Sequence, residues 1–230
     1  YGLIGPNGAG KTTVFNLLTG VYKPSEGIVR LDGDDITGKS ITDINKAGIA
    51  RTFQNIRLFK ELSVLDNVKA GLHNQHKYSV IEGIFRLPNY YKVEKEMDER
   101  AMEILKVFDL DKEAETLASN LPYGKQRKLE IARALASKPS FILLDEPLAG
   151  IDPIAVNDIR SLVSQLKNRG LGVLITDHNV QETLSITSRA YLLFEGRILF
   201  QGTPEELSQN EIVRQKYLGS NFVLRRKNFM

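Results

Sequence analysis

A glycine-rich segment near the start of the chain has the composition of a phosphate-binding loop. Its residues 5–12, GPNGAGKT, fit the pattern G-x-x-x-x-G-K-[ST], which requires a strand before the loop and a helix after it. Glycines let backbone N–H groups converge on phosphate oxygens, and the start of a helix adds positive potential. The segment therefore predicts a nucleoside-triphosphate site, with Lys11 on the β- and γ-phosphates and Thr12 on Mg²⁺. The residues expected to bind the nucleotide here are Gly5, Pro6, Asn7, Gly8, Ala9, Gly10, Lys11, Thr12 and Thr13.

Two adjacent acids follow an apolar segment later in the chain. The segment FILLDE, residues 141–146, is typical of a buried parallel strand that ends at Asp145 and Glu146. Beside a phosphate loop, such a pair suits a metal ion and a water molecule, so we expect Asp145 to hold Mg²⁺ through its shell and Glu146 to polarise the attacking water. Without the loop, the same pattern would fit a strand that ends in a solvated acidic turn.

A histidine follows a second strand of the same type. His178 comes directly after GVLITD, residues 172–177, and ligands of open α/β sheets bind at the carboxyl ends of the strands. His178 is therefore placed where it could contact a γ-phosphate, although spacing alone also fits a structural histidine. His73 and His76 lie in an irregular segment and are expected at the surface.

The elements that must position these residues are those of an α/β domain. Strands are expected at the start of the chain, around 28–31, over 49–54, 141–146 and 172–177, and in a hairpin that turns at Glu195 and Gly196. Helices are expected after the phosphate loop and over 154–166, and Thr203, Pro204 and Glu206 predict the start of a last helix.

Between the strands, the chain has a helical pattern from about residue 63 to 136. Ser63 and Asp66 predict a capping box, whereas residues 73–91 look irregular. An apolar stripe at helical spacing, expected to be core, is formed by Val93, Met97, Ala101, Ile104, Leu105 and Phe108. We expect a single domain over 1–230, with an α/β core (1–55 and 137–230) and a mostly helical subdomain (56–136).

Composition limits the classes of function. Among 230 residues, 42% are hydrophobic, 26% are charged and none is cysteine, which excludes disulfides and thiolate metal sites. A net charge of +3 is too small to imply nucleic acid, and the basic cluster Arg225-Arg226-Lys227 is expected to be a solvated tail. No apolar run approaches the roughly 18 residues of a membrane span, so membrane association would come through a partner.

The order of these motifs resembles the nucleotide-binding domain of ABC transporters. The phosphate loop, Gln54, LPYGKQ, the Asp-Glu strand, LAGID and His178 follow one another in the family's order over essentially the whole chain. The resemblance implies that Gln54 is the Q-loop glutamine, which senses Mg²⁺ or water and contacts the membrane partner. By the same matching, Asp152 in LAGID is the D-loop aspartate, His178 the switch histidine and Glu146 the catalytic base.

The resemblance also implies a fold, an activity and partners. The fold would be a P-loop NTPase of the RecA-like type, with a mainly parallel sheet and a helical signature subdomain. The activity would be ATP hydrolysis with Mg²⁺, coupled to transport through a membrane permease at the cytoplasmic face of the cell membrane. Because each ATP lies between one P-loop and the other chain's signature, a homodimer or a pair with a similar subunit is expected, without nucleic acid.

Two other classes were weighed against this one. A soluble ABC ATPase of the DNA-repair or translation type usually carries zinc-binding cysteines, coiled-coil insertions or tandem cassettes, and the sequence shows none of these. A P-loop kinase or GTPase would leave Gln54, His178 and LPYGKQ unexplained. Transport is therefore the favoured function, with the soluble ABC ATPase as the alternative.

The signature-like segment departs from the family's Leu-Ser-Gly-Gly-Gln. Pro122 replaces the serine whose hydroxyl would contact a phosphate, whereas Gly124 is retained. Backbone N–H groups at a helix start can bind phosphate without a side chain, so Tyr123 and Gly124 remain expected contacts. Proline is compatible with a helix start but supplies neither a hydroxyl nor an N–H. The segment predicts a genuine signature helix with one phosphate contact missing.

Two further features concern the ends and the subfamily. The family places additional strands and an adenine-stacking aromatic before the P-loop, so these strands look missing, the chain resembles a fragment and weak ATP affinity is expected. Up to about residue 145, segments such as RTFQNIRLFKELSVLDNVKAGLH resemble branched-chain amino acid importer ATPases. Later segments, such as GLGVLITDHNVQETL and YLGSNFVLRRK, resemble the lipopolysaccharide-export ATPase. An intermediate lineage and a chimaera both fit this mixture.

Overall fold

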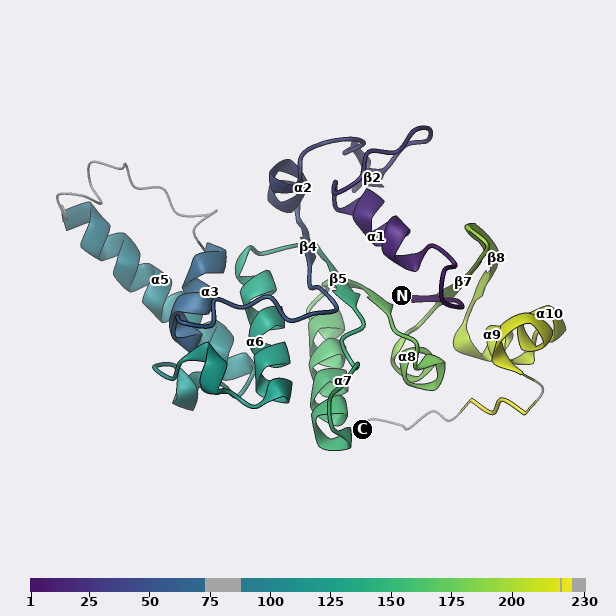
Figure 1. The fold of residues 1–230 in the computed structure, drawn as a ribbon. Helices are drawn as coiled ribbons and strands as arrows, with labels where there is room; N and C mark the ends of the chain where they lie inside the picture. The colour runs from purple at the N-terminus through teal and green to yellow at the C-terminus, as the bar shows by residue number, and fades with distance from the viewer. Residues whose placement is uncertain (73–87, 220, 225–230) are drawn as a thin grey trace.

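The fold was analysed in a computed structural model that describes residues 1–72, 88–219 and 221–224, except for the side chains of Pro153 and Ile154. The described residues form a six-stranded sheet with the order β4-β5-β6-β1-β7-β8 (Figure 1). Its strands are β1 (Gly2–Ile4), β4 (Ile49–Arg51), β5 (Phe141–Asp145), β6 (Gly172–Thr176), β7 (Ala190–Phe194) and β8 (Arg197–Gly202). The neighbours from β4 to β7 are parallel, and β8 is antiparallel to β7. The expected mainly parallel α/β sheet is confirmed.

Helices cover both faces of the sheet, and the apolar strands have the composition that this burial requires. On β5, Leu143 packs in the cluster that holds Phe15 and Ile44, whereas its neighbours Ile142 and Leu144 belong to the cluster on the other face. The helices are α1 (Lys11–Leu18), α2 (Ile41–Ala47), α3 (Val64–Leu72), α5 (Pro88–Val107), α6 (Tyr123–Ala136), α7 (Pro153–Asn168), α8 (Val180–Ile186) and α9 (Pro204–Gln209). Shorter elements are β2 (Arg30–Leu31), β3 (Asp34–Asp35), α10 (Glu211–Val213), the 3₁₀ turns Asp111–Glu113 and Ala118–Asn120, and the π-helical turn Arg214–Leu218.

The helices α3, α5 and α6 pack beside the sheet, on the left in Figure 1. The predicted apolar stripe of α5 is confirmed, since Met97, Ala101 and Leu105 are fully buried in the same cluster as the β5 residues. The Ser63 hydroxyl oxygen accepts the Asp66 N–H at 3.0 Å, as the expected cap requires. Residues 73–87, including His73 and His76, lie outside the described residues, but α5 begins at Pro88, so the irregular segment expected up to residue 91 ends earlier.

The C-terminal part of the described chain contains two confirmed predictions and one error. Glu195 and Gly196 have φ values of 48° and 76°, which suit the tight turn of the predicted hairpin. The capping box of Thr203 and Glu206 is present at the start of α9. This helix is not the last one, because α10 and a π-helical turn follow it. The basic cluster at residues 225–227 lies outside the described residues.

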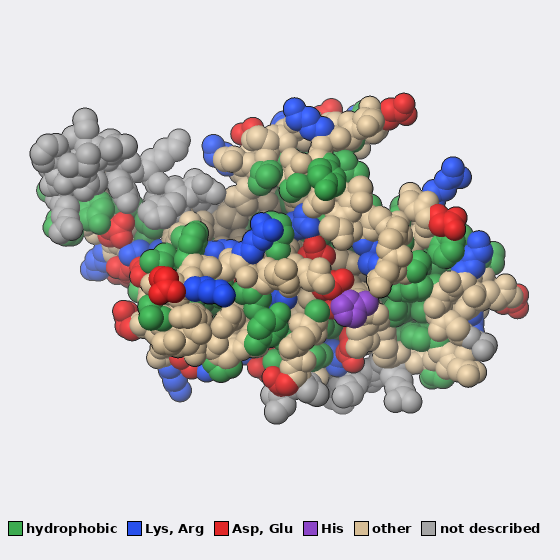
Figure 2. All heavy atoms as spheres, viewed as in Figure 1, with side chains coloured by type: hydrophobic (Ala, Val, Ile, Leu, Met, Phe, Trp, Pro, Cys, Tyr) green, Lys and Arg blue, Asp and Glu red, His purple; other side chains and the backbone are tan. Residues whose placement is uncertain are grey.

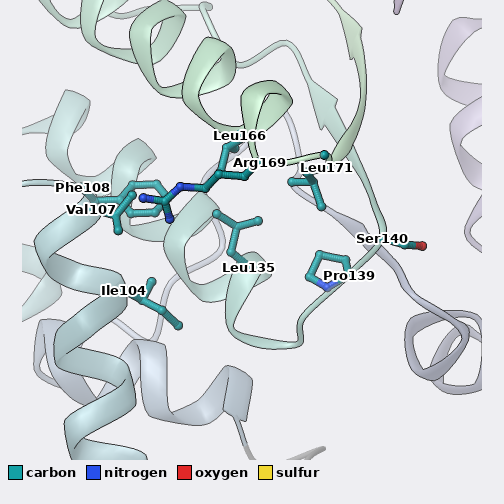
Figure 3. Close-up of a pocket in the computed structure, with 10 residues that line it drawn as sticks. Ile104, Val107, Phe108, Leu135, Pro139, Ser140, Leu166, Arg169 and Leu171 are labelled. Atoms are coloured by element: carbon teal, nitrogen blue, oxygen red, sulfur yellow. The ribbon is translucent and has the colours of Figure 1, made fainter.

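An apolar cavity of about 300 Å³ lies where the ends of α5, α6 and α7 meet (Figure 3). Its lining residues include Ile104, Phe108, Leu135, Leu166 and Arg169. Pro139 and Ser140, which precede β5, also line it, so it lies at the amino end of this strand. No helix among the described residues is long and apolar enough to cross a membrane.

Candidate nucleotide site

The phosphate loop connects β1 to α1, as its sequence predicts. Gly5 passes so close to β7 that a Cβ atom there would lie 2.1 Å from the Leu193 carbonyl oxygen, which only glycine avoids. The loop is closed by the Ala9 N–H, which donates to the Pro6 carbonyl at 3.2 Å. The Gly196 N–H of the hairpin turn donates to the Ala9 carbonyl at 3.0 Å. The loop is therefore held by its own backbone and by the β7–β8 turn.

The first turn of α1 provides backbone donors for an anion. Gly10, with φ of 103°, precedes the helix, and the ladder begins with the Val14 N–H, which donates to the Gly10 carbonyl at 2.9 Å. The N–H groups of Lys11, Thr12 and Thr13 therefore have no intrahelical partner. Thr12 and Thr13 are exposed, and a helix N-terminus of this kind carries positive potential. The loop and helix fit the triphosphate that the sequence predicts.

Lys11 is folded back over the loop. Its Nζ donates to the carbonyl oxygens of Gly5 at 2.7 Å and of Pro6 at 2.9 Å. Burial lowers the pKa of Lys11, and the nearby carboxylates of Glu146 and Asp145 oppose this shift. The Lys11 ammonium group has three N–H donors, and the loop carbonyls are their acceptors here. A phosphate oxygen can replace one of these carbonyls as the acceptor.

A residue from the far end of the chain also contacts this loop. The hydroxyl of Tyr217 donates to the Gly5 carbonyl at 3.2 Å, which is the oxygen that Lys11 also contacts. Burial raises the pKa of Tyr217. The hydrogen bond to the Gly5 carbonyl lowers this pKa, and the negative charge of Asp177 raises it, both by less than burial does. No sequence pattern predicts this contact, because Tyr217 belongs to no motif.

The acidic pair lies at the carboxyl end of β5. Asp145 is buried, and its Oδ2 accepts a hydrogen bond from Arg51 at 2.7 Å. Glu146 leaves the strand with a positive φ of 48°, while its N–H donates to the Thr176 carbonyl at 2.8 Å. The Nδ1 of His178 lies 3.3 Å from Glu146 Oε2, a buried oxygen without a hydrogen bond among the described residues. The expected strand over 141–146 thus ends one residue early, and the backbone turn brings Glu146 to His178.

Figure 2 shows how open this site is. The purple side chain of His178, the only histidine among the described residues, lies on the surface beside acidic groups. Its side chain is 59% exposed, compared with 18% for Glu146. Residues from the ends of β5 and β6 therefore meet at the carboxyl edge of the sheet, next to the phosphate loop. The apolar cavity of Figure 3 is at the opposite end of β5 and is not part of this site.

Gln54 is exposed, and its backbone rather than its side chain is fixed. The fully buried Arg127 of α6 donates to the carbonyls of Phe53 and Gln54, each at 2.7 Å, and to Glu130 at 2.8 Å. Glu130 in turn accepts the Arg57 N–H at 3.1 Å. These bonds explain why the strand expected over 49–54 ends at Arg51: the next carbonyls turn toward α6 instead of a neighbouring strand.

The signature-like segment forms the start of α6. Pro122 is its N-cap residue, with no side-chain capping bond, and its carbonyl accepts the first helical N–H from Gln126 at 2.9 Å. The N–H groups of Tyr123, Gly124 and Lys125 are thus left without intrahelical partners. Gly124 packs against α7, since a Cβ atom there would lie 2.8 Å from the Ala155 Cβ.

Asp152 caps the neighbouring helix, where its Oδ1 accepts the Ala155 N–H at 2.9 Å. Gly150, two residues before Asp152, lies beside the Tyr123 ring. A Cβ atom built on Gly150 would lie 3.8 Å from a ring carbon of Tyr123. The segment LAGID and the signature-like segment therefore lie side by side. In Figure 1 the start of α6 lies apart from the phosphate loop, which precedes α1.

A parallel sheet with this loop after β1 and an acidic pair after β5 defines a P-loop NTPase. Residues 1–149 match the protein family described as ABC transporter. The chain is 40% identical over 218 residues to the high-affinity branched-chain amino acid transport ATP-binding protein BraF of Pseudomonas aeruginosa, a match that covers 94% of this chain and 86% of the relative. It is 41% identical over 223 residues to the lipopolysaccharide export system ATP-binding protein LptB of Haemophilus influenzae, with 97% and 87% covered.

Solved structures agree with this class. The ADP conformation of MJ1267, an ATP-binding cassette of an ABC transporter, matches with a TM-score of 0.81 and 34% identity over 95% of this chain and 87% of that one. A dimeric post-hydrolysis state of the cassette MJ0796, bound to ADP and phosphate, matches with a TM-score of 0.71 and 26% identity over 88% and 84%. The chain belongs to the ABC transporter family, and it is an ATP-binding subunit of the ATPase type.

Proposed function

We propose that this chain hydrolyses ATP to drive transport through a membrane permease, to which it binds at the cytoplasmic face of the membrane. The observation that carries this proposal is the meeting of Lys11, Asp145, Glu146 and His178 at one edge of the sheet. A phosphate binder, a buried acid, a second acid and a histidine are the groups that transfer of a phosphoryl group to water requires. The resemblance to transport ATPases supports the coupling to a permease.

The phosphates are bound by the loop and the first turn of α1. The free N–H groups face the nucleotide, and Lys11 exchanges its carbonyl contacts for the β- and γ-phosphates. Oxygen donors suit Mg²⁺, and the Thr12 hydroxyl, the Asp145 carboxylate and the Gln54 side chain are the proposed ligands, directly or through water. When bound, Mg²⁺ neutralises charge on the transferred phosphoryl group.

Glu146 is the proposed general base. Its Oε2 is buried without a hydrogen bond among the described residues, while the side chain as a whole is 18% exposed, so the attacking water is proposed to bind to the other oxygen, Oε1. His178, at 3.3 Å, is the proposed contact to the γ-phosphate and holds Glu146 in position. Both groups stand on short connections after buried strands, which fix their backbones.

A second cassette completes the proposed site. Tyr123, Gly124 and Asp152 lie side by side but apart from the phosphate loop of the same chain (Figure 1). We propose that they contact the nucleotide held by a partner cassette, either a second copy or a similar subunit. The helical subdomain over 56–136 would carry Tyr123 and Gly124 of this surface, while the core formed by 1–55 and 137–230 would contribute Asp152 and hold the nucleotide. The dimeric relative supports this arrangement.

The transported substrate is proposed from the relatives. Branched-chain amino acids and lipopolysaccharide are named for relatives of nearly equal identity, 40% and 41%. Reconstitution in vesicles with a permease of each transport system separates the two. ATP-dependent accumulation of leucine identifies an importer, and ATP-dependent extraction of lipopolysaccharide identifies an exporter.

Glu146→Gln tests the proposed chemistry. Glutamine keeps the shape of the side chain but accepts no proton, so phosphate release should fall by about 100-fold or more while ATP binding persists. Lys11→Ala should instead weaken ATP binding, because the charge on the phosphates is lost. Lys95→Ala, on an exposed position of α5, is the matched control. Normal turnover in Glu146→Gln would refute the base, and unchanged binding in Lys11→Ala would refute the phosphate site.

A further inference from the structure

Arg51, the last residue of β4, carries a guanidinium group into the interior beside the proposed cation site. Its side chain is only 7% exposed, and Nη2 lies 2.7 Å from Oδ2 of Asp145, whose side chain is 8% exposed. The two residues are 94 positions apart in the chain, on neighbouring strands β4 and β5. This is a buried ion pair on the acid to which the proposed function assigns Mg²⁺.

The guanidinium is held from several sides. Its Nη1 donates to Asn16 Oδ1 at 2.6 Å and to Thr19 Oγ1 at 3.3 Å, both from the helix that follows the phosphate loop. The rings of Phe15 and Phe53 lie 5.4 Å and 5.0 Å from its central carbon, within the range of cation–π attraction. Arg51 therefore has one fixed position, which is set by α1 and by the segment that leads to Gln54.

A buried carboxylate needs a partner charge at all times. Its desolvation is costly, and removing one member of a buried pair leaves an uncompensated charge. Lys11 is near enough to interact with Asp145 electrostatically but forms no ion pair with it, because its Nζ is bonded to the carbonyls of Gly5 and Pro6. Arg51 contacts one carboxylate oxygen of Asp145, Oδ2, which leaves Oδ1 for another ligand. Asp145 thus has a permanent counter-ion, Arg51, at Oδ2 and keeps Oδ1 for a ligand.

We propose that Arg51 is a positioning residue for the cation site: it neutralises and orients the Asp145 carboxylate while no divalent cation is bound. The inference rests on the proposed role of Asp145 in holding Mg²⁺. A bound cation then supplies part of the positive charge that Arg51 otherwise supplies by direct contact. Arg51 also joins the cation site to α1 and to the strand before Gln54, so that these three parts keep one arrangement when the site is empty.

Arg51→Met tests the proposal, since methionine fills much of the space without charge. Thermal unfolding of the full chain is followed in EDTA, in ADP with EDTA, and in ADP with Mg²⁺. In EDTA, Arg51→Met should unfold roughly 10 °C below the unmodified chain, because Asp145 has lost its counter-ion. The rise in Tm caused by Mg²⁺ in the presence of ADP should be several degrees larger than in the unmodified chain. An equal deficit in all three buffers would show a merely structural role and overturn the proposal.

Two further variants separate charge from packing. Arg51→Lys keeps the charge, so its Mg²⁺-dependent rise should return toward that of the unmodified chain. Arg51→Met combined with Asp145→Asn removes both charges, so it should unfold at a higher temperature than Arg51→Met alone and show a smaller Mg²⁺-dependent rise than either Arg51→Met or the unmodified chain. If Arg51→Met does not fold, the double variant decides: its folding supports the proposal, and its failure to fold overturns it.

The unmodified chain distinguishes this inference from the proposed function. If Mg²⁺ does not raise its Tm in the presence of ADP, the proposed cation site is wrong. The comparison of Arg51→Met with the double variant in EDTA still tests the ion pair in that case, because it requires no bound cation. Asp145→Asn alone completes this comparison: if the effects of Arg51→Met and Asp145→Asn in EDTA simply add in the double variant, Arg51 does not compensate Asp145.

Discussion

At the scale of single residues, one carbonyl oxygen of the phosphate loop has two donors with different tasks. Lys11 and Tyr217 both donate to the Gly5 carbonyl, at 2.7 Å and 3.2 Å. In the proposed mechanism Lys11 leaves this oxygen for the phosphates, whereas Tyr217 stays. Because burial raises the pKa of Tyr217, its hydroxyl remains a donor at neutral pH. Tyr217 therefore keeps the carbonyl paired when the lysine has moved to the nucleotide.

Tyr217→Phe should weaken ATP binding while leaving the fold intact. The ring keeps its packing, but the loop carbonyl loses a hydrogen bond worth about 0.5–1.5 kcal/mol, which corresponds to a rise in Kd of roughly 2- to 10-fold. Titration with ATP measures the change, and Tyr91→Phe, an exposed tyrosine on α5, is the matched control. Equal Kd values for the two variants would show that the Tyr217 hydroxyl does not support the loop.

The residues that sequence reasoning found and missed differ in one respect. The predicted site residues each stand within a short motif whose strand or helix can be recognised from neighbouring residues. They are Lys11, Asp145, Glu146 and His178. Arg51, Arg127 and Tyr217 were missed because their partners lie 94, 73 and 212 positions away along the chain. Only the fold brings such pairs together, and a single sequence carries no pattern for them. The roles of the motif residues themselves stay predictions until the variants are measured.

At the scale of elements, α6 connects the signature-like segment to the Q-loop segment. Pro122 opens the helix without a side-chain cap, and Arg127, one turn later, binds the carbonyls of Phe53 and Gln54. Because the buried guanidinium group of Arg127 is bonded to the Gln54 carbonyl, a displacement of the start of α6 would also move the backbone of Gln54. Proline fits the N-cap position sterically but leaves the first N–H groups unpaired.

Pro122→Ser should add what the helix start lacks. A serine hydroxyl at the N-cap can accept a backbone N–H of the first turn, which stabilises helices by about 0.5–2 kcal/mol, and it can donate to a phosphate of the partner's nucleotide. We expect faster ATP turnover or a more stable ATP-bound dimer. Pro122→Ala, which removes the ring without adding a hydroxyl, is the control. A serine variant that behaves like the alanine variant would show that the missing hydroxyl is of no consequence.

Helices and strands could be predicted from the sequence where a regular apolar pattern runs through the whole element. The prediction failed where a contact with a distant residue ends the element. The apolar stripe of α5 and the apolar runs of β5 and β6 are long enough to be recognised in the sequence, and all three elements are present, although β5 and β6 each end one residue before the expected bound. The strand expected up to Gln54 stops at Arg51 because Arg127 takes the next carbonyls. The short α10 and the π-helical turn after α9 depend on packing against β7 and the P-loop strand, where Val213 and Tyr217 join the same apolar cluster. Their short sequences alone do not define a helix.

At the scale of the whole molecule, the two parts of the proposed nucleotide site, the phosphate loop and the start of α6, lie apart within one chain. The phosphate loop lies on one side of the sheet edge, and the start of α6 lies with LAGID beside α7 (Figure 1). Each has unpaired N–H groups suited to phosphate, yet one chain does not bring them together. Two copies arranged head to tail would pair each loop with the other copy's signature, and ATP would then hold the copies together.

This arrangement predicts a dimer that depends on unhydrolysed ATP. In the Glu146→Gln variant with ATP and Mg²⁺, light scattering should give about twice the 25.8 kDa mass of the chain, whereas ADP should leave monomers. Lys11→Ala in the same background should remain monomeric, because its phosphates are not held. Tyr123→Asp, at an exposed residue of the same helix start, places a negative charge where the partner's phosphate would bind. It should also prevent the dimer while leaving ATP binding to the loop unchanged. A dimer of the same stability with ADP, or one that tolerates Tyr123→Asp, would mean that the copies associate through another surface.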